Sequence, residues 1–168
     1  MHTYIIIANI LSLISVGLNC ISSFFKTKKR ILFLQTLECI IGGISQILCR
    51  SFSASIQLFL GAIRTYIAIN ENTKKIVYWI FSLVSLILGL IFNNRGLIGL
   101  LPIFATIQIT LWNGYFKTGQ QVRYGMVVNF IPWIIHDFIV KMYVSSIIMT
   151  LTMIITIINI IRYRDIKE

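Results

Sequence analysis

Apolar runs near 20 residues recur along this chain from one end to the other. A run of about 20 apolar residues is what an α-helix needs to cross a bilayer. Only helices and closed barrels satisfy their backbone in lipid, and barrel strands would alternate polar and apolar residues, which these runs do not. We therefore expect an all-α membrane protein. The runs predict seven transmembrane helices, at residues 3–23, 31–49, 52–70, 76–92, 97–115, 122–140 and 143–161.

The composition agrees with this class. The chain has 168 residues, of which 57% are hydrophobic and 12% charged, which excludes a disordered chain. The net charge of +10 would also suit a nucleic-acid-binding protein. However, the basic residues stand in short loops between apolar runs, where they set the topology and contact anionic lipids. We expect membrane lipid, and no nucleic acid, as a partner.

The basic residues are distributed unequally between the two sides. Three of them, Arg50, Arg95 and Lys141, follow even-numbered predicted helices, and Arg64 lies inside one. The other eleven follow odd-numbered helices: Lys26, Lys28, Lys29, Arg30, Lys74, Lys75, Lys117, Arg123, Arg162, Arg164 and Lys167. Because cytoplasmic loops carry the excess of Lys and Arg, this predicts an external N-terminus and a cytoplasmic C-terminus.

The chain also resembles itself when it is shifted by 91 residues without a gap. The shift aligns FKT at 25–27 with the second FKT at 116–118, Arg50 with Lys141, and SI at 55–56 with the later SI. It makes the first three predicted helices equivalent to the last three. Because each unit has an odd number of helices, a direct fusion would invert the second unit in the membrane. The fourth predicted helix is then a linker that gives both units the same orientation.

This repeat predicts a 3+1+3 arrangement. Residues 1–70 would form the first three-helix bundle and residues 71–96 the linker helix. Residues 97–168 would form the second bundle and a short cytoplasmic tail. Parallel repeats of this kind are a transporter design, with the substrate site at the repeat interface.

Four short motifs resemble the YgjV family of bacterial inner-membrane proteins, in order and spacing. They are GAIRT at 61–65, LLPI at 100–103, WIIHD at 133–137 and NIIR at 159–162. The resemblance covers roughly residues 10–163. It extends to the wider PQ-loop/MtN3 group, which includes SWEET and SemiSWEET sugar facilitators, PnuC vitamin transporters and KDEL receptors. It implies three-helix bundles paired around a central path, in the bacterial cytoplasmic membrane.

The chain departs from the SWEET-like pattern in its prolines. The group has helix-kinking prolines in both repeats, whereas here the two prolines, Pro102 and Pro132, both fall in the second. The equivalent of Pro132 is followed by Gly42 and Gly43, which offer flexibility instead of a kink. We take these four residues as hinge candidates. The PQ dipeptide is absent, so sugar transport does not follow from the resemblance.

Two charged residues, Glu38 and Arg64, fall within predicted helices at similar depths. Charges inside the membrane are costly, so each is a candidate functional residue. We predict that the two form an ion pair. The pair would either hold the first bundle together or serve the substrate, through a carboxylate contact by Arg64 or a gate that breaks during transport. The repeat equivalents, Asn129 and Ile155, do not preserve it.

A second polar pair, His136 and Asp137, lies near the external end of the sixth predicted helix. Its repeat equivalents, Ser45 and Gln46, are also polar, and the two pairs would face each other at one depth. The four residues are candidates for an external gate. Because imidazole titrates near neutral pH, a proton relay is an alternative. A third is that Asp137 only meets water or Lys141, four residues on.

The remaining substrate-path candidates are Gln57, Gln108, Asn129 and Trp133. An aromatic wall with a few amides suits a neutral polar solute or a flat ring. Together with Glu38 and Arg64, they would line the path between the bundles.

We expect a small-solute transporter, either a facilitator or a proton-coupled carrier, in which one bundle rocks against the other. A receptor, or an accessory or scaffold subunit that transports nothing, is the alternative. An enzyme is not expected, because HExxH and GxSxG motifs are absent and the ligands for a metal or cofactor are too few. The expected partner is a small polar solute, and a homo-oligomer is left open.

Overall fold

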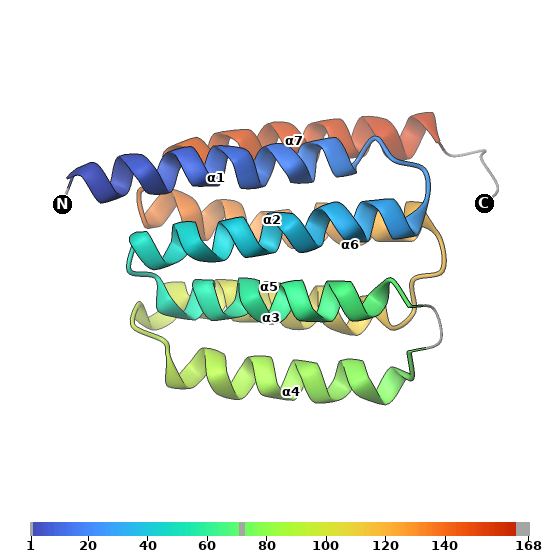
Figure 1. Cartoon of the computed structure of the whole chain (residues 1–168), viewed down its shortest axis with the longest axis horizontal. Coiled ribbons are helices and arrows are strands. Elements are labelled where there is room, and N and C mark those ends of the chain that lie inside the picture. The colour runs from blue at the N-terminus through green and yellow to red at the C-terminus, as the bar shows by residue number, and fades with distance from the viewer. Residues whose placement is uncertain (1, 71–72, 164–168) are drawn as a thin grey trace.

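The computed structural model describes residues 2–70 and 73–163, with only the backbone described for residues 2 and 3. The predicted tail, with Arg164 and Lys167, lies outside these ranges. Within them all regular structure is helical, as predicted. The elements are α1 (His2–Ser22), α2 (Lys28–Leu48), α3 (Phe52–Ala68), α4 (Lys75–Ile91), the 3-10 turn η1 (Gly96–Gly99), α5 (Leu100–Asn113), α6 (Gly119–Ile139) and α7 (Tyr143–Arg162). Each helix runs antiparallel to the next (Figure 1).

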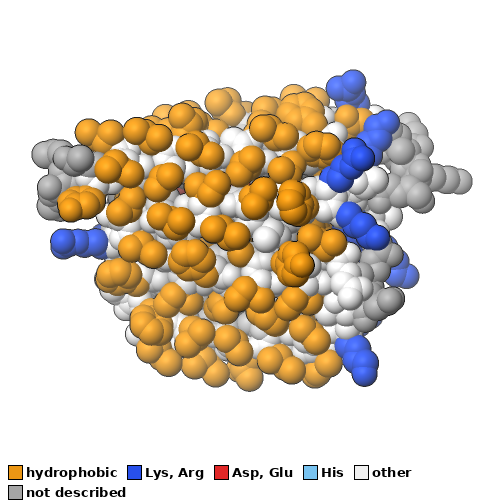
Figure 2. Space-filling view, in the orientation of Figure 1, with side chains coloured by type: hydrophobic (Ala, Val, Ile, Leu, Met, Phe, Trp, Pro, Cys, Tyr) orange, Lys and Arg blue, Asp and Glu red, His pale blue; other side chains and the backbone are white. Residues whose placement is uncertain are grey.

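The outside of this bundle is apolar. Large hydrophobic side chains are exposed along all seven helices, and Figure 2 shows them covering the sides of the molecule. Four helical segments are long and apolar enough to cross a membrane: Tyr4–Ser22, Lys28–Leu48, Gly96–Asn113 and Tyr143–Arg162. A surface of this kind is stable in lipid and not in water.

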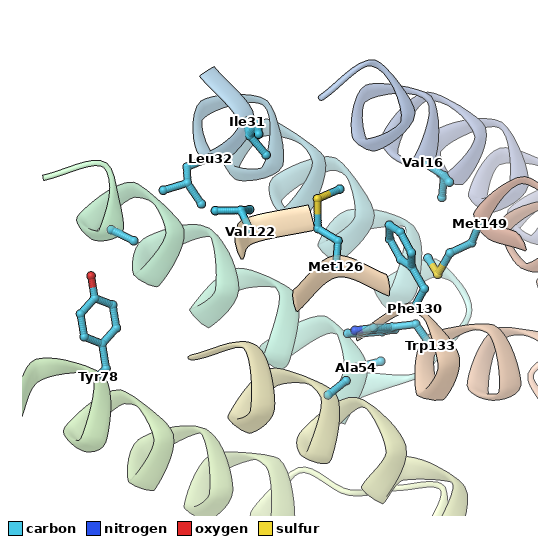
Figure 3. Packing of buried hydrophobic residues seen from close by; sticks show 12 residues of the cluster. Val16, Ile31, Leu32, Ala54, Tyr78, Val122, Met126, Phe130, Trp133 and Met149 are labelled. Atoms are coloured by element: carbon cyan, nitrogen blue, oxygen red, sulfur yellow. The ribbon is translucent and has the colours of Figure 1, made fainter. Parts of the chain in front are cut away.

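The inside is polar by comparison. Among the described residues, buried polar side chains outnumber buried apolar ones. Many hydroxyls donate to the carbonyl four residues earlier, as Thr156 does to Thr152 at 2.7 Å. The apolar core is narrow: Met126, Phe130 and Trp133 follow one face of α6 and point between the helices (Figure 3). Such an interior suits helices that meet through hydrogen bonds and small residues.

The helix neighbours place α4 at the periphery. The helix α2 packs between α1 and α3, and α6 packs between α5 and α7. Between these two groups, α1 contacts α7 and α3 contacts α5. The helix α4 packs on α3 and α5 at one edge of the bundle (Figure 1).

The two ends of the bundle differ in charge. We call the end with the α1–α2, α3–α4 and α5–α6 connections the basic end, and the other the opposite end. Most of the visible Lys and Arg side chains lie at the basic end (Figure 2). The opposite end carries Arg50, Arg95 and Lys141.

The predicted starts of α2 and α6 are each three residues late. Lys28, assigned to a loop, is the first residue of α2 and is buried. Arg123, counted with the loop residues although it falls within the predicted helix 122–140, is the fifth residue of α6 and is also buried. The start of α6 is fixed by a capping box, in which Thr118 accepts from the Gln121 amide and the Gln121 side chain accepts from the Thr118 amide. The Thr-x-x-Gln spacing was a readable signal for this earlier start.

The helices α2 and α6 end in the same way. Arg50 and Lys141, which follow them, have φ values of 55° and 68°. The next amide N–H, of Ser51 or Met142, donates to a helix carbonyl five residues earlier, at 3.0 and 2.8 Å. This is the left-handed helix end that normally carries glycine.

Glycine at either left-handed position should therefore be tolerated. We expect Arg50→Gly and Lys141→Gly to leave the free energy of unfolding unchanged or raise it by up to about 1 kcal/mol, because glycine relieves the left-handed strain. Thermal unfolding in detergent would measure this. The matched controls Arg50→Ala and Lys141→Ala remove the same charges but keep the strain, so an equal effect of alanine and glycine would contradict the prediction.

Candidate functional site

A cavity of about 70 Å³ lies at the centre of the bundle. Six helices line it, and α4 contributes no lining residue. Its polar lining consists of Ser12, Ser15, Asn19, Gln35, Glu38, Ser45, Gln46, Gln57, Arg64, Thr65, Thr106, Asn129, Asp137 and Ser145. The cavity therefore lies between the helix groups α1–α3 and α5–α7.

Several polar atoms at this cavity are buried without a hydrogen-bond partner among the described residues. They are Ser12 Oγ, Gln46 Oε1, Gln57 Oε1 and Arg64 Nε. Nearly all buried polar groups in proteins are paired, so orphaned atoms in one cavity require an explanation. Donors and acceptors both occur, which suits a small polar guest and not an apolar one.

The predicted ion pair between Glu38 and Arg64 is wrong. Both side chains are buried and line the cavity, but the described residues contain no salt bridge between them. Glu38 Oε2 lies 3.3 Å from the Cys39 thiol, and Glu38 Oε1 lies 3.5 Å from Ser15 Oγ. The carboxyl group thus meets only weak donors.

Arg64 is instead held by threonines. Its Nη1 donates to Thr110 Oγ1 at 3.0 Å and more weakly to the Thr106 carbonyl at 3.4 Å, both in α5. Its Nη2 donates to Thr65 Oγ1 at 3.0 Å. The guanidinium therefore connects α3 to α5.

The predicted pair assumed that Glu38 and Arg64 lie at similar depths in the membrane, and this assumption was inaccurate. Glu38 stands ten residues after the start of α2, whereas Arg64 stands four before the end of α3. At 1.5 Å per residue, their backbones lie about 15 Å and about 6 Å from the basic end. Because helical side chains tilt toward the N-terminus, Arg64 leans back into the cavity, but a gap remains.

A buried hydrogen-bond network lines the cavity toward the opposite end. Gln46 Nε2 donates to Asp137 Oδ1 at 2.9 Å, and Ser145 donates to Asp137 Oδ2. His136 Nδ1 lies 3.0 Å from Asp137 Oδ1, and His136 Nε2 lies 3.1 Å from Ser51 Oγ. The network joins α2 to α6 and also includes the start of α7.

The expectation that the two polar pairs face each other is confirmed for Gln46 and Asp137. Ser45 behaves differently, because its hydroxyl donates to the Ala8 carbonyl in α1 at 2.7 Å. The predicted contact of Asp137 with Lys141 is wrong, since the Asp137 side chain is buried and Lys141 is exposed, whereas a contact with water in the cavity stays a prediction.

Sequence reasoning missed Ser51 and Ser145 as partners in this network. Each stands at or near a helix start, where serine is so common that its type gives no signal. The pairing of neighbouring His136 and Asp137 was also uncertain beforehand, because successive helical residues point about 100° apart.

Three of the four remaining path candidates line the cavity: Gln57, Asn129 and Trp133. Gln108 does not, and its Oε1 accepts a 3.4 Å hydrogen bond from Asn129. A group outside the cavity orients the Gln57 side chain: its Nε2 donates to the Ser85 carbonyl of α4 at 2.8 Å.

The hinge candidates have different surroundings. Gly42 lines the cavity, and a β-carbon there would lie 2.9 Å from Ser15 Oγ. At Gly43 it would lie 3.0 Å from the Phe59 ring. Both glycines therefore allow close helix packing.

The prolines also differ. Pro132 lies inside α6, as predicted, whereas Pro102 lies in the first turn of α5 after η1. A first-turn proline breaks no intrahelical hydrogen bond. Pro102 therefore marks a helix start rather than a kink.

Arg123 joins the two helix groups at the basic end. Its side chain is 1% exposed, and Nε donates to the Ser23 carbonyl at 3.1 Å. Its Nη2 donates to the Phe25 carbonyl, and Nη1 donates to Gln120 Oε1 at 2.9 Å. The arginine of α6 thus binds the α1–α2 connection.

Within the described residues, no group of three or more His, Cys, Asp or Glu side chains could hold a metal ion. A family model for a bacterial inner membrane protein, Imp-YgjV, matches residues 6–167 of this chain. No curated protein and no solved structure matches it.

Proposed function

Because this chain belongs to the Imp-YgjV family of bacterial inner membrane proteins, we propose that it carries a small polar solute across that membrane. It works by alternating access, either as a facilitator or as a proton-coupled carrier. The single observation that carries this proposal is the central cavity with its unpartnered polar atoms, enclosed between two groups of three helices.

The helix bounds support two equivalent three-helix units, α1–α3 and α5–α7, linked by α4. Helices α2 (28–48) and α6 (119–139) begin and end 91 residues apart, which is the offset of the sequence repeat. The left-handed residues Arg50 and Lys141 have the same separation, and so have the bonded Gln46 and Asp137. Units related in this way can rock against each other around a fixed site. A relation to the wider PQ-loop/MtN3 group stays a prediction.

Polar contacts at the two ends supply the gates. At the opposite end Gln46 binds Asp137, and at the basic end Arg123 binds the α1–α2 connection. Each contact joins the two units, so rocking would break one and keep the other. His136 contacts Asp137 in this gate, and an imidazole can accept and release a proton, so proton coupling would act here.

In this proposal all seven helices cross the membrane, with the basic end in the cytoplasm. The short α3 and α4, of 17 residues each, are at the lower limit of the length with which a helix crosses a bilayer. The excess of Lys and Arg at the basic end sets the orientation, with the N-terminus outside.

Uptake into proteoliposomes would test the proposal. We expect one class from a panel of radiolabelled sugars, nucleosides, amino acids and short organic acids to enter faster than into protein-free liposomes. Trp133→Ala, in the cavity, should lower this uptake. Ser82→Ala, equally buried in α4 but outside the cavity, should not. If no solute enters, or the two variants behave alike, a receptor or accessory subunit becomes the better explanation.

A further inference from the structure

Glu38 and Arg64 are an acid and a base that face one cavity without neutralising each other. Their side chains are 8% and 7% exposed. A buried charge is unfavourable unless a group of opposite charge meets it. One guest that offers a cation to Glu38 and an anion to Arg64 would satisfy both at once.

The free hydrogen-bonding capacity of Arg64 matches a carboxylate. A guanidinium has five N–H donors, and the described contacts of Arg64 occupy two on Nη1 and one on Nη2. The Nε–H and one Nη2–H remain, and Nε has no partner among the described residues. Nε and Nη2 are neighbours on one planar group, and such a fork binds the two oxygens of a carboxylate.

The acceptors of the cavity match an ammonium group. Glu38 meets only a thiol and a distant hydroxyl, which leaves most of its acceptor capacity unused. Gln46 Oε1 and Gln57 Oε1 line the same cavity and have no partner among the described residues. A primary ammonium group offers three N–H donors, enough for Glu38 and for an amide oxygen at a similar depth, such as Gln57 Oε1. Gln46 stands eight residues beyond Glu38 in α2, about 12 Å along the helix axis, and is too far away to share that ammonium group.

The separation of the two charged groups is compatible with the length of an α-amino acid. Cys39 Sγ lies 3.3 Å from Glu38 Oε2, and a β-carbon on Gly61 would lie 3.4 Å from that sulfur and 3.7 Å from Arg64 Nη2. Carboxyl and guanidinium are therefore at most about 10 Å apart. An α-amino acid spans about 3 Å from nitrogen to carboxylate oxygen, so with a hydrogen bond at each end it bridges about 8–9 Å.

We propose that the solute is a small neutral amino acid, bound as a zwitterion with its carboxylate on Arg64 and its ammonium group on Glu38. This inference rests on the transporter proposed above and names its substrate class. The volume of about 70 Å³ favours a short side chain, and Trp133, Phe130 and Met149 provide its apolar surroundings.

Binding to the purified full-length protein in nanodiscs would test this class, with alanine as the probe. Alaninamide lacks the carboxylate, N-acetylalanine lacks the ammonium group, and glycine betaine keeps both charges but has no N–H donor. We expect alanine to bind at least about tenfold more tightly than each of these, because hydrogen bonds to charged groups are the strong ones. Equal binding of alanine and alaninamide would overturn the assignment.

Two variants test which charged residue binds which end of alanine. The readout is the ratio of the affinities for alanine and an analogue, which a general loss of stability would not change. Arg64→Gln should bring the alanine-to-alaninamide affinity ratio close to one, and Glu38→Gln should do so for alanine and N-acetylalanine. Arg95→Gln is the control, since it also removes a guanidinium, but one that is exposed and outside the cavity. It should keep both ratios, and a control that changed them as Arg64→Gln does would contradict the role of Arg64.

Gly61→Ala keeps the proposal testable if the charge variants do not fold. The added β-carbon would make ordinary contacts with Cys39 and Arg64, and alanine is favourable within a helix. The variant should therefore fold, narrow the gap between the two charged groups, and weaken alanine binding several-fold. Unchanged alanine affinity in Gly61→Ala would count against this binding site.

The results separate this inference from the transporter proposal. If another solute class enters proteoliposomes while no amino acid binds, the amino-acid site is wrong and transport stands. If alanine binds with the expected ratios but never crosses the bilayer, the site stands and transport is wrong.

Discussion

Asp137→Ala should make Cys39 react at least about tenfold faster with a membrane-impermeant thiol reagent added at the opposite end. Asp137 accepts hydrogen bonds from Gln46 and Ser145 and contacts His136, so alanine leaves Gln46 and Ser145 buried without this partner and leaves His136 with Ser51 alone. Losing one partner from such a buried cluster costs about 3–5 kcal/mol. If only 1.4 kcal/mol of this cost destabilises the closed state relative to the open state, the closed-to-open ratio falls tenfold.

Cys39 is a native reporter for this experiment. Its side chain is buried and lines the cavity, and the chain contains only two other cysteines, Cys20 and Cys49. In a Cys20→Ser, Cys49→Ser background, labelling from each side of a proteoliposome would report access to the cavity alone. Mass spectrometry would quantify the labelled fraction over time.

Asp137→Asn is the matched control, since its side chain keeps one oxygen for the Gln46 donor and fills the same space. It should raise the labelling rate less than Asp137→Ala does. If Asp137→Ala raised labelling equally from both sides, the helices would be loosened in general, and the network would not be a gate.

The apolar runs predicted most of the fold, because the lipid requirement acts on whole segments. Number, order and type of the helices depend on average hydropathy over about 20 residues, so errors at single positions do not matter. The start of α2 shifted because Lys28 was taken for a loop residue, whereas it binds a carbonyl at a helix connection. The start of α6 shifted because the capping box of Thr118 and Gln121 was not used.

The candidate site depended on finer geometry, and there the prediction was less accurate. Intramembrane charge alone identified Glu38 and Arg64 as cavity residues. Their lack of pairing came from an axial offset that only exact helix ends reveal. In contrast, the contact of Gln46 with Asp137 agrees with the expectation, drawn from the 91-residue offset in the sequence, that the two polar pairs face each other.

Arg123→Met should make Cys39 react faster with the same thiol reagent when it is added at the basic end. Methionine keeps much of the length of the side chain but offers no donors to the Ser23 and Phe25 carbonyls. A hydrogen bond from a charged group to such a carbonyl is worth about 1.5–3 kcal/mol. We therefore expect a rise of about tenfold or more, measured in the same Cys39-only background as for Asp137→Ala.

The pair of variants tests whether the two ends are coupled. In alternating access both gates bias one equilibrium, so a variant that favours opening at one end must populate opening at the other end less. Arg123→Met should accordingly slow Cys39 labelling from the opposite end, and Asp137→Ala should slow it from the basic end. Faster labelling at the near end with no change at the far end would mean that the ends open independently, as in a channel rather than a carrier.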